Sequence, residues 1–166
     1  GGFLFGDWRY EKDEKTLKPD FVLNAPYNSD AKILLARDNF GCGSSREHAV
    51  WALKGFGIRC VIAPSFGEIF FNNCFKNMVL PLVLDEASIE TICAQIAEGQ
   101  REVSVDLKAQ TVAALDGSTY KFEIDAARKD ALLKGLDAIG VTLDGWDQIK
   151  TWQDTDRAKR PWIYLD

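Results

Sequence analysis

The alternation of apolar runs with helix-like segments between residues 32 and 84 constrains the fold more than any other feature. Residues 32–36, 59–63 and 80–84 are short apolar runs with the length and composition of buried strands. Residues 45–54 and 65–77 lie between them and carry apolar side chains at helical spacing. Because parallel strands need a crossover connection, this order predicts an α/β unit in which helices join parallel strands.

The chain changes character after residue 100. Residues 102–107, 111–115 and 119–124 alternate polar and apolar side chains, and Asp116-Gly117 is a hairpin signal between the last two segments. We expect these segments to pair as antiparallel strands. Further helices are expected at residues 85–98, 125–136 and 146–155.

Several residues are expected to punctuate these elements. Ser65 is positioned to cap the helix at 65–77, and Asn77 to help end it. Gly135 and Gly140 are expected to interrupt the helical region near residue 136. Residues 19–26 lie between prolines and are expected to form an extended connection. The tail, residues 157–166, is basic and then aromatic without clear periodicity, which leaves two interpretations open, a docking arm or a frayed end.

Length and charge narrow the class of protein. The chain has 166 residues, of which 46% are hydrophobic, and a net charge of −5 with charges of both signs mixed along it. This length predicts one domain, spanning residues 1–166, with a substantial core. The charge argues against nucleic acid or an anionic membrane as a partner, and no apolar run is long enough to span a bilayer. We expect a cytoplasmic protein.

The cysteines are distributed in a way that argues against a metal site. Cys42, Cys60, Cys74 and Cys93 form no Cys-x-x-Cys pair and no His/Cys cluster with metal-ligand spacing. We therefore expect this chain alone to hold no metal and no iron–sulfur cluster. Cys60 and Cys93 lie in apolar stretches and are interpreted as small core residues rather than disulfide partners.

Residues 38–51, with the sequence DNFGCGSSREHAVW, have the outline of an anion site. Gly41 and Gly43 allow a sharp turn that brings backbone N–H groups close to a ligand. The positive end of the following helix dipole favours negative charge. Arg46 adds a planar fork of donors suited to a carboxylate or a phosphate.

A structural interpretation of the same residues competes with this one. Ser44 and Glu47 have the spacing of a capping box, which is the more common use of such residues on local chemistry alone. A dinucleotide fingerprint is disfavoured because Arg46 stands where the third glycine belongs. The Gly-x-Ser-x-Gly elbow of serine hydrolases is absent, and His48 has no obvious carboxylate to orient it.

Beyond these local patterns, the sequence resembles the small subunits of the 3-isopropylmalate dehydratases, which belong to the aconitase superfamily. Residues 39–49 carry the most specific part of the resemblance, and further similar segments extend it over nearly the whole chain. These segments are DWRY at 7–10, PDFVLN at 19–24, VIAPSF at 61–66, FEID at 122–125 and GLDAIG at 135–140.

The resemblance implies half of an enzyme. It implies a three-layer β/β/α swivelling domain, like the aconitase C-terminal domain, and a large-subunit partner in a heterodimer or heterotetramer. That partner would hold a [4Fe-4S] cluster, and the pair would interconvert 2-isopropylmalate and 3-isopropylmalate, a dicarboxylate hydroxy acid of leucine biosynthesis. By similarity, Ser44 would be the catalytic base, with Gly43, Ser45 and Arg46 binding the substrate. Glu47 and His48 are interpreted as structural.

Two points depart from the family pattern. Relatives usually carry a further segment before residues 7–10, with an acidic motif and a strand, so we expect the chain to lack an N-terminal segment. They also use a second arginine, for which Arg9 and Arg37 are the candidates, either for the substrate or for the interface with the large subunit.

Two alternatives to the leading function stay open from the sequence. One keeps the enzyme class and changes the substrate to homoaconitate or a methylmalate-type or citraconate-type acid. The other is a stand-alone anion-binding or regulatory module, in which the serine–arginine segment simply holds a carboxylate.

Overall fold

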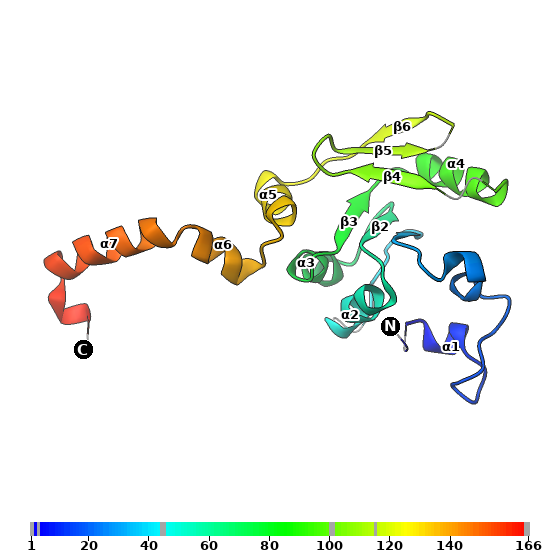
Figure 1. Ribbon diagram of the computed structural model, residues 1–166, viewed down its shortest axis with the longest axis horizontal. Coiled ribbons are helices and arrows are strands. Elements are labelled where there is room, and N and C mark those ends of the chain that lie inside the picture. The colour runs from blue at the N-terminus through cyan, green and yellow to red at the C-terminus, as the bar shows by residue number, and fades with distance from the viewer. Residues whose placement is uncertain (1, 3, 44–45, 100–101, 115, 165–166) are drawn as a thin grey trace.

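A computed structural model describes residues 2, 4–43, 46–99, 102–114 and 116–164 (Figure 1). Its parallel sheet has the strand order β1-β2-β3, with Ile33 opposite Cys60 and Cys60 opposite Leu80. Helices α2 and α3 make the crossovers. This confirms the parallel unit predicted from the alternating pattern. The elements are β1 (Ile33–Leu35), α2 (His48–Phe56), β2 (Cys60–Ala63), α3 (Glu68–Lys76) and β3 (Leu80–Val83).

The central strand of the parallel sheet is buried on both faces. All four residues of β2 are buried, and the side chains of residues 60–62 alternate between two hydrophobic clusters. Val61 faces the cluster that contains residues of α2 and α3. Cys60 and Ile62 face the other cluster, which α4 and the second sheet complete. A central strand covered on both sides reads as a continuous apolar run, which explains why its sequence shows no alternation.

The second sheet is antiparallel and has the order β4-β5-β6, as its alternating sequence predicted. Val112 of β5 packs with Ile62 of β2 and Ile92 of α4. Asp85 caps α4 by accepting a hydrogen bond from the Ser88 N–H at 2.8 Å. Helices, parallel sheet and antiparallel sheet therefore form the three layers expected of a β/β/α domain. The elements are α4 (Glu86–Ala97), β4 (Val103–Asp106), β5 (Thr111–Ala114) and β6 (Thr119–Lys121).

The first part of the described chain wraps around the end of α2. It contains the short helix α1 (Gly6–Arg9) and the 3-10 turns η1 (Val22–Asn24) and η2 (Pro26–Asn28). The sequence predicted an extended connection over residues 19–26, and the structure instead forms these tight turns, with Pro26 starting η2. Proline fixes a φ that also suits the first residue of a helical turn, so the prolines fit this conformation equally well.

The last elements leave the body of the molecule. Helix α5 (Ala126–Lys134) ends at Gly135 with a φ of 67°, and α6 (Ala138–Asp144) and α7 (Trp146–Lys159) then project away (Figure 1). We call residues 138–164 the C-terminal arm; it closes with η3 (Pro161–Ile163). Gly140 lies inside α6 rather than between helices, so its predicted role as an interruption was wrong. Helix α7 also continues beyond the predicted residue 155.

Candidate functional site

The glycine loop, residues 38–43, leaves the carboxyl end of β1 and lies against the loop that follows β2. The Phe40 N–H donates to the Ser65 carbonyl at 3.0 Å, and the Gly67 N–H donates to the Phe40 carbonyl at 2.9 Å. These bonds extend the parallel pairing of the two strands by one short bridge. The loop therefore has a fixed position at the carboxyl edge of the sheet, where α/β proteins place their ligands.

Gly41 is required because the loop backbone rests directly on a buried ring. Its φ is 75°, and a Cβ added there would lie 2.2 Å from Cγ of Phe70. Phe70 is buried and packs edge-on against Phe40, with ring centroids 5.4 Å apart, so it has little room to move. A Cβ on Gly67 would meet the Cys42 backbone at 3.0 Å. Close backbone approach, and not only turn geometry, therefore explains both glycines.

Ser65 holds the glycine loop and does not cap α3. The residue preceding α3 is Gly67, which offers no side-chain cap. The Ser65 hydroxyl instead accepts a hydrogen bond from the Asn39 N–H at 2.8 Å and donates one to the Asp38 carboxylate. The predicted cap was wrong because a tertiary partner, 26 residues away, competes for the same hydroxyl.

The predicted base Ser44 and the predicted substrate ligand Ser45 lie outside the described residues. Gly43 and Arg46, on either side of them, are exposed. Within the described part of the chain, the Arg46 guanidinium makes no hydrogen bond and no ion pair. A cation held beside the start of α2 without a protein partner suits the binding of an anionic group.

Helix α2 begins at His48, three residues later than the sequence predicted. Glu47 takes the N-cap position but makes no capping bond with its side chain. Its carboxylate accepts a hydrogen bond from Nδ2 of Asn77 at 2.7 Å. Asn77 follows α3, as predicted, and also donates to the Asn73 carbonyl at 2.9 Å. The capping box pairs Glu47 with Ser44, which lies outside the described residues; within them, the Glu47 carboxylate contacts the residue that follows α3.

The link between Glu47 and Asn77 is a site feature that the sequence analysis missed. It joins the residue before α2 to the residue after α3, and so fixes where the chain that follows the glycine loop enters its helix. Residues 30 positions apart give no local signal of contact. General rules of helix packing allow a contact between two helices, but they do not identify which residues make it.

A cavity of about 730 Å³ lies beside the glycine loop. Its walls come from α1, η1, the end of β1 and residues 40–42, and they are mainly apolar. Arg37 belongs to this wall, although its exposed guanidinium lies 3.0 Å from Glu90 and 3.8 Å from Glu86 of α4. The hydrogen bond to Glu90 raises the Arg37 pKa above its ordinary value. The structure thus brings Arg37 to the same cavity as the glycine loop.

Arg9 occupies a different place. Its Nε donates to the Asn24 side-chain carbonyl at 2.9 Å, and its guanidinium lies 5.0 Å from the ring centroid of Phe56. Phe56 is the last residue of α2, whereas Arg46 precedes the first, so the helix separates them by about 12 Å of axial rise. The structure therefore does not bring Arg9 and Arg46 together.

The described residues offer no place for a metal or an iron–sulfur cluster. They contain no group of three or more His, Cys, Asp or Glu side chains arranged to hold an ion. Burial raises the pKa of the Cys60 and Cys74 thiols to about 12, which opposes the thiolate form that ligates metals. Among these residues there is also no helix with the length and apolar content needed to cross a membrane.

Comparison with known proteins places this geometry in a family. The aconitase C-terminal domain family matches residues 2–87, and the family described as LeuD_N matches residues 93–126. The 3-isopropylmalate dehydratase small subunit of Sinorhizobium fredii is 52% identical over 163 residues, which cover 98% of this chain and 81% of that protein. The protein of the same name from a Jannaschia species is 52% identical over 164 residues, with the same coverage.

A solved structure agrees with these sequence relatives. The crystal structure of 3-isopropylmalate dehydratase (leuD) from Methanocaldococcus jannaschii is 29% identical and superimposes with a TM-score of 0.56. The match covers 72% of this chain and 68% of that one. Family match, identity and fold point the same way: the chain belongs to the small subunits of 3-isopropylmalate dehydratase, in the aconitase superfamily.

Proposed function

We propose that this chain, with a large subunit, interconverts 2-isopropylmalate and 3-isopropylmalate in leucine biosynthesis as a hydro-lyase. The observation that carries the proposal is the 52% identity, over 98% of the chain, to small subunits of 3-isopropylmalate dehydratase. The anion site at the start of α2 suits a substrate with two carboxylates. Residues 1–166 act as a single swivelling domain that presents this site to the partner.

We assign a [4Fe-4S] cluster to the large subunit, because this chain matches the small subunits of the same enzyme. The residues that the structure describes here form no ligand set for such a cluster. In the large subunit the cluster would act as a Lewis acid for the hydroxide that leaves the substrate. The residues of this chain bind the substrate and move a proton.

Ser44 is the proposed base. The reaction removes a proton from an unactivated carbon, while the hydroxide on the neighbouring carbon departs. The Ser44 alkoxide takes the proton and becomes a hydroxyl, and the electron pair of the C–H bond forms the carbon–carbon double bond. In rehydration the Ser44 hydroxyl gives the proton to the carbon that lost hydroxide. Hydroxide then adds to the carbon that lost the proton, so the substrate hydroxyl ends on the neighbouring carbon.

A serine alkoxide needs strong support because its hydroxyl is a very weak acid in water. The start of α2 and the Arg46 guanidinium provide positive charge in the same short segment. The glycine loop before it is fixed by Ser65, Gly67 and Phe70, which limits the reorganisation needed during the reaction. A partner that excludes water from this edge would strengthen each of these interactions.

Arg46 is the proposed clamp for a substrate carboxylate, with Ser45 and the Gly43 backbone binding the same group. Its guanidinium is exposed and unpaired among the described residues, so no existing bond has to break. Arg37 is the better of the two candidates for the second arginine, because it lines the cavity beside the glycine loop. We place Arg9 in packing of the first segment against Phe56.

Reconstitution with a cluster-bearing large subunit under anaerobic conditions tests the proposal. The alkene absorbance formed from 3-isopropylmalate is followed for the wild type, Ser44→Ala and Ser45→Ala. Because a positioned general base contributes about 10²- to 10⁴-fold, Ser44→Ala should lower kcat by at least 10²-fold with unchanged subunit association. Ser45→Ala should act mainly on KM. Arg46→Lys should also raise KM, because a lysine cannot donate in the bidentate manner of arginine.

Each outcome of the assay has a distinct meaning. Full turnover by Ser44→Ala would remove Ser44 from the chemistry and move the base to the large subunit. Turnover of homoaconitate or a methylmalate-type acid, but not of 3-isopropylmalate, would keep the enzyme class and change the substrate. Tight binding of a dicarboxylate by the isolated chain, with no gain from the partner, would favour an anion-binding module.

A further inference from the structure

The C-terminal arm exposes an unusual amount of apolar surface. On α6, the side chains of Ile139 and Leu143 are 70% and 58% exposed, and they share one face because they are four residues apart. Val141 lies on the opposite face and is also exposed. Trp152 of α7 and Trp162 of η3 are exposed as well. A helix that is apolar on more than one face is normally buried, so α6 has the composition of a covered helix.

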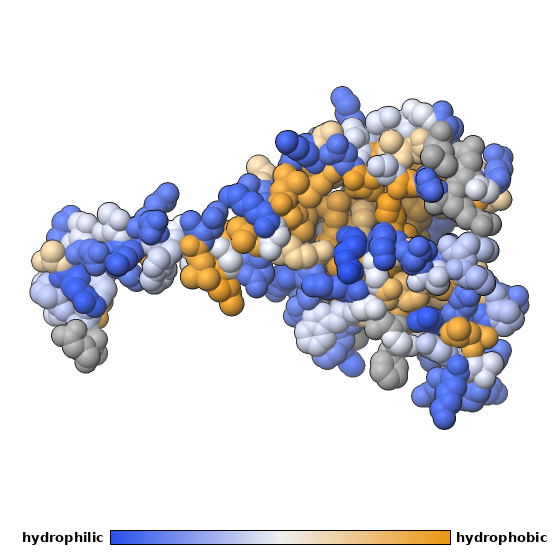
Figure 2. All heavy atoms as spheres, viewed as in Figure 1, coloured by the Kyte–Doolittle hydropathy of each residue, from blue (hydrophilic) through white to orange (hydrophobic). Residues whose placement is uncertain are grey.

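Figure 2 shows the same feature on the surface. Hydrophobic residues gather on α6, between the body and the mostly hydrophilic α7. Among the arm residues that the structure describes, the only buried side chain is that of Asp156. The arm therefore buries little of its own apolar surface in the isolated chain.

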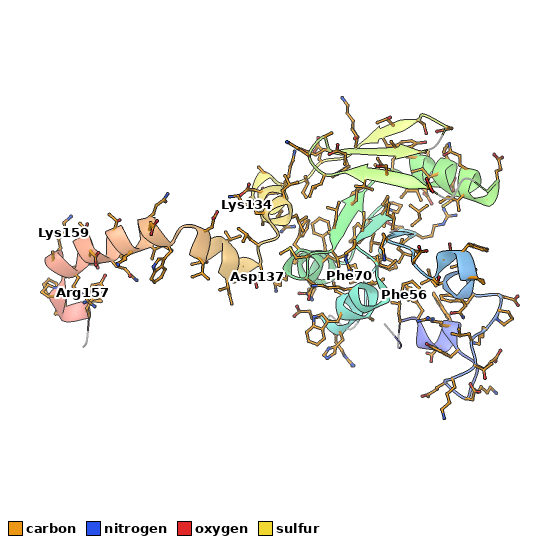
Figure 3. All side chains as sticks on the ribbon, viewed as in Figure 1. Phe56, Phe70, Lys134, Asp137, Arg157 and Lys159 are labelled. Carbon is orange, nitrogen blue, oxygen red and sulfur yellow. The ribbon has the colours of Figure 1, made fainter. Side chains whose placement is uncertain are left out.

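Polar contacts nevertheless hold the arm in a defined shape (Figure 3). Lys134 of α5 lies 2.9 Å from Asp130 and 3.0 Å from Asp144, and so links α5 to the end of α6. Asp137 caps α6 by accepting from the Gly140 N–H at 2.7 Å. These contacts set the angle at which α6 leaves the body.

The end of the arm is folded back on itself. The Asp156 carboxylate accepts from Nε of Arg160 at 2.8 Å and from the Tyr164 hydroxyl at 2.8 Å. The Arg157 guanidinium lies 5.1 Å from the centroid of the Tyr164 ring. We call Asp156, Arg157, Arg160 and Tyr164 the terminal hook. Of the two interpretations that the sequence left open, a frayed end does not describe a segment with these contacts.

The relatives indicate what the arm is for. The matched families end at residue 126, before the arm, whereas the two small subunits match 98% of the chain and so include most of it. The arm is therefore shared with proteins that are named small subunits. A small subunit has a large partner, and that partner could cover the arm.

The position of the arm agrees with such a partner. Helices α2 and α3 lie toward the end of the body from which the arm projects, whereas α1 and α4 lie at the opposite end (Figure 1). The proposed site residues precede α2 in the chain. One large chain seated on that side would contact the arm and cover the site together.

We propose that the apolar faces of the C-terminal arm, centred on Ile139, Leu143 and Trp152, are a docking surface for the large subunit. This inference rests on the proposed function, because it takes the partner from it. Contacts within α5, α6 and the terminal hook pre-organise the arm, so little order has to be created on binding. The arm acts in assembly and touches no reacting atom.

The test measures binding separately from catalysis. The full-length double variant Ile139→Asp/Leu143→Asp is titrated against the cluster-reconstituted large subunit by anaerobic interferometry. Charges placed at the centre of a docking surface should weaken binding about 30-fold or more. The matched control is Leu17→Asp, an exposed residue of the first segment at 45% exposure, which should bind as the wild type does. At saturating large subunit, both variants should reach the wild-type kcat.

Folding of each variant is checked by its thermal midpoint, which should not move because Ile139 and Leu143 touch no core residue. Trp152→Glu is a second docking-surface variant and should also weaken binding. Wild-type affinity in both arm variants would overturn the docking surface while an active wild-type pair still upheld the proposed function. Loss of self-association with intact affinity for the large subunit would assign the arm to a second copy instead. A wild-type chain that binds no large subunit would overturn both proposals.

Discussion

The body and the C-terminal arm of this chain are stabilised by different physical means. In the body, residues of β2 such as Val61 and Ile62 are fully buried, and each faces its own hydrophobic cluster. In the arm, apolar side chains are exposed, and polar contacts between near neighbours in sequence set the shape. The hydrophobic effect therefore stabilises the body much more than the arm, whose exposed apolar surface is available for an interface.

This difference bears on how the two regions act in the complex. A rigid body presents the glycine loop, whose backbone is packed on Phe70 at Gly41. The shape of the arm is set by its own ion pairs and helix caps and not by packing on the core. The arm can therefore meet a partner without disturbing the site.

The largest expected contrast comes from truncating one isoleucine in each region. Ile62→Ala removes a fully buried side chain from β2 and should lower the free energy of unfolding by about 2–5 kcal/mol. Ile139→Ala removes an exposed side chain from α6 and should change it by no more than about 0.5 kcal/mol. Urea unfolding of the isolated chain, followed by circular dichroism, gives both values.

Equal losses of unfolding free energy for the two variants would contradict the difference between body and arm, because they would show that the arm packs on the body in solution. The Ile139→Ala chain is then measured again with the large subunit bound. The same substitution should then cost stability in the complex, where the docking surface is covered.

A smaller contrast is expected for glycine-to-alanine substitutions. Gly41→Ala forces a Cβ into Phe70 at a φ of 75° and should destabilise the chain by about 1–3 kcal/mol. Gly140→Ala lies in helix α6, where alanine is favoured by about 0.5–1 kcal/mol. Its Cβ would lie 3.1 Å from Cδ2 of Leu136 and 3.3 Å from Oδ1 of the capping Asp137, and both side chains must shift slightly to accept it.

Thermal midpoints and the helical circular dichroism signal separate the two glycine variants. Gly43→Ala is the control within the glycine loop, because nothing lies within 4 Å of its added Cβ. It should leave the midpoint unchanged. A stable Gly41→Ala protein would show that the loop can leave Phe70, which would contradict the rigid site.

Thiol reactivity measures the difference in burial between the body and the arm. Burial raises the pKa of Cys60 and Cys74 to about 12, and both thiols lie in the core of the body. Reaction with iodoacetamide at pH 8 should therefore wait for opening of the body, while the exposed Cys42 reacts first. A thiol placed on the proposed docking surface by Leu143→Cys should react as fast as Cys42 and become protected when the large subunit binds.

Much of this architecture follows from local sequence signals. The strands, their parallel or antiparallel pairing, and the end of α3 at Asn77 were predicted because hydrophobic periodicity and turn chemistry act over short distances. The roles of Ser65 and Glu47 were not. Each was expected to cap a helix, and each instead bonds a residue about 30 positions away, a partner that sequence spacing cannot identify.

The candidate site shows the same division. Glycine spacing and Arg46 indicated an anion site, and the structure fixes the loop that leads to it. The reason for Gly41 is contact with Phe70, which the sequence did not reveal. The sequence predicted most of α7 but not α6, because Gly140 was expected to interrupt the chain where α6 forms.

The smallest expected effect concerns the terminal hook and its dependence on pH. Burial of the Asp156 carboxyl raises its pKa, but hydrogen bonds from Arg160 and Tyr164 outweigh this and lower the pKa overall. A carboxyl with a lowered pKa stabilises the folded state above its unfolded pKa of about 4, and this contribution is lost as pH falls through the folded value. The protection of amides 157–164 against hydrogen exchange, relative to their intrinsic rates, should therefore fall below about pH 4, and already at pH 7 in Asp156→Asn. Asp154→Asn, an exposed neighbour, should leave that exchange unchanged. The urea midpoint of the body should stay constant in both variants, since the hook touches no core residue; a shift of that midpoint in Asp156→Asn would show that the arm and the body unfold as one unit.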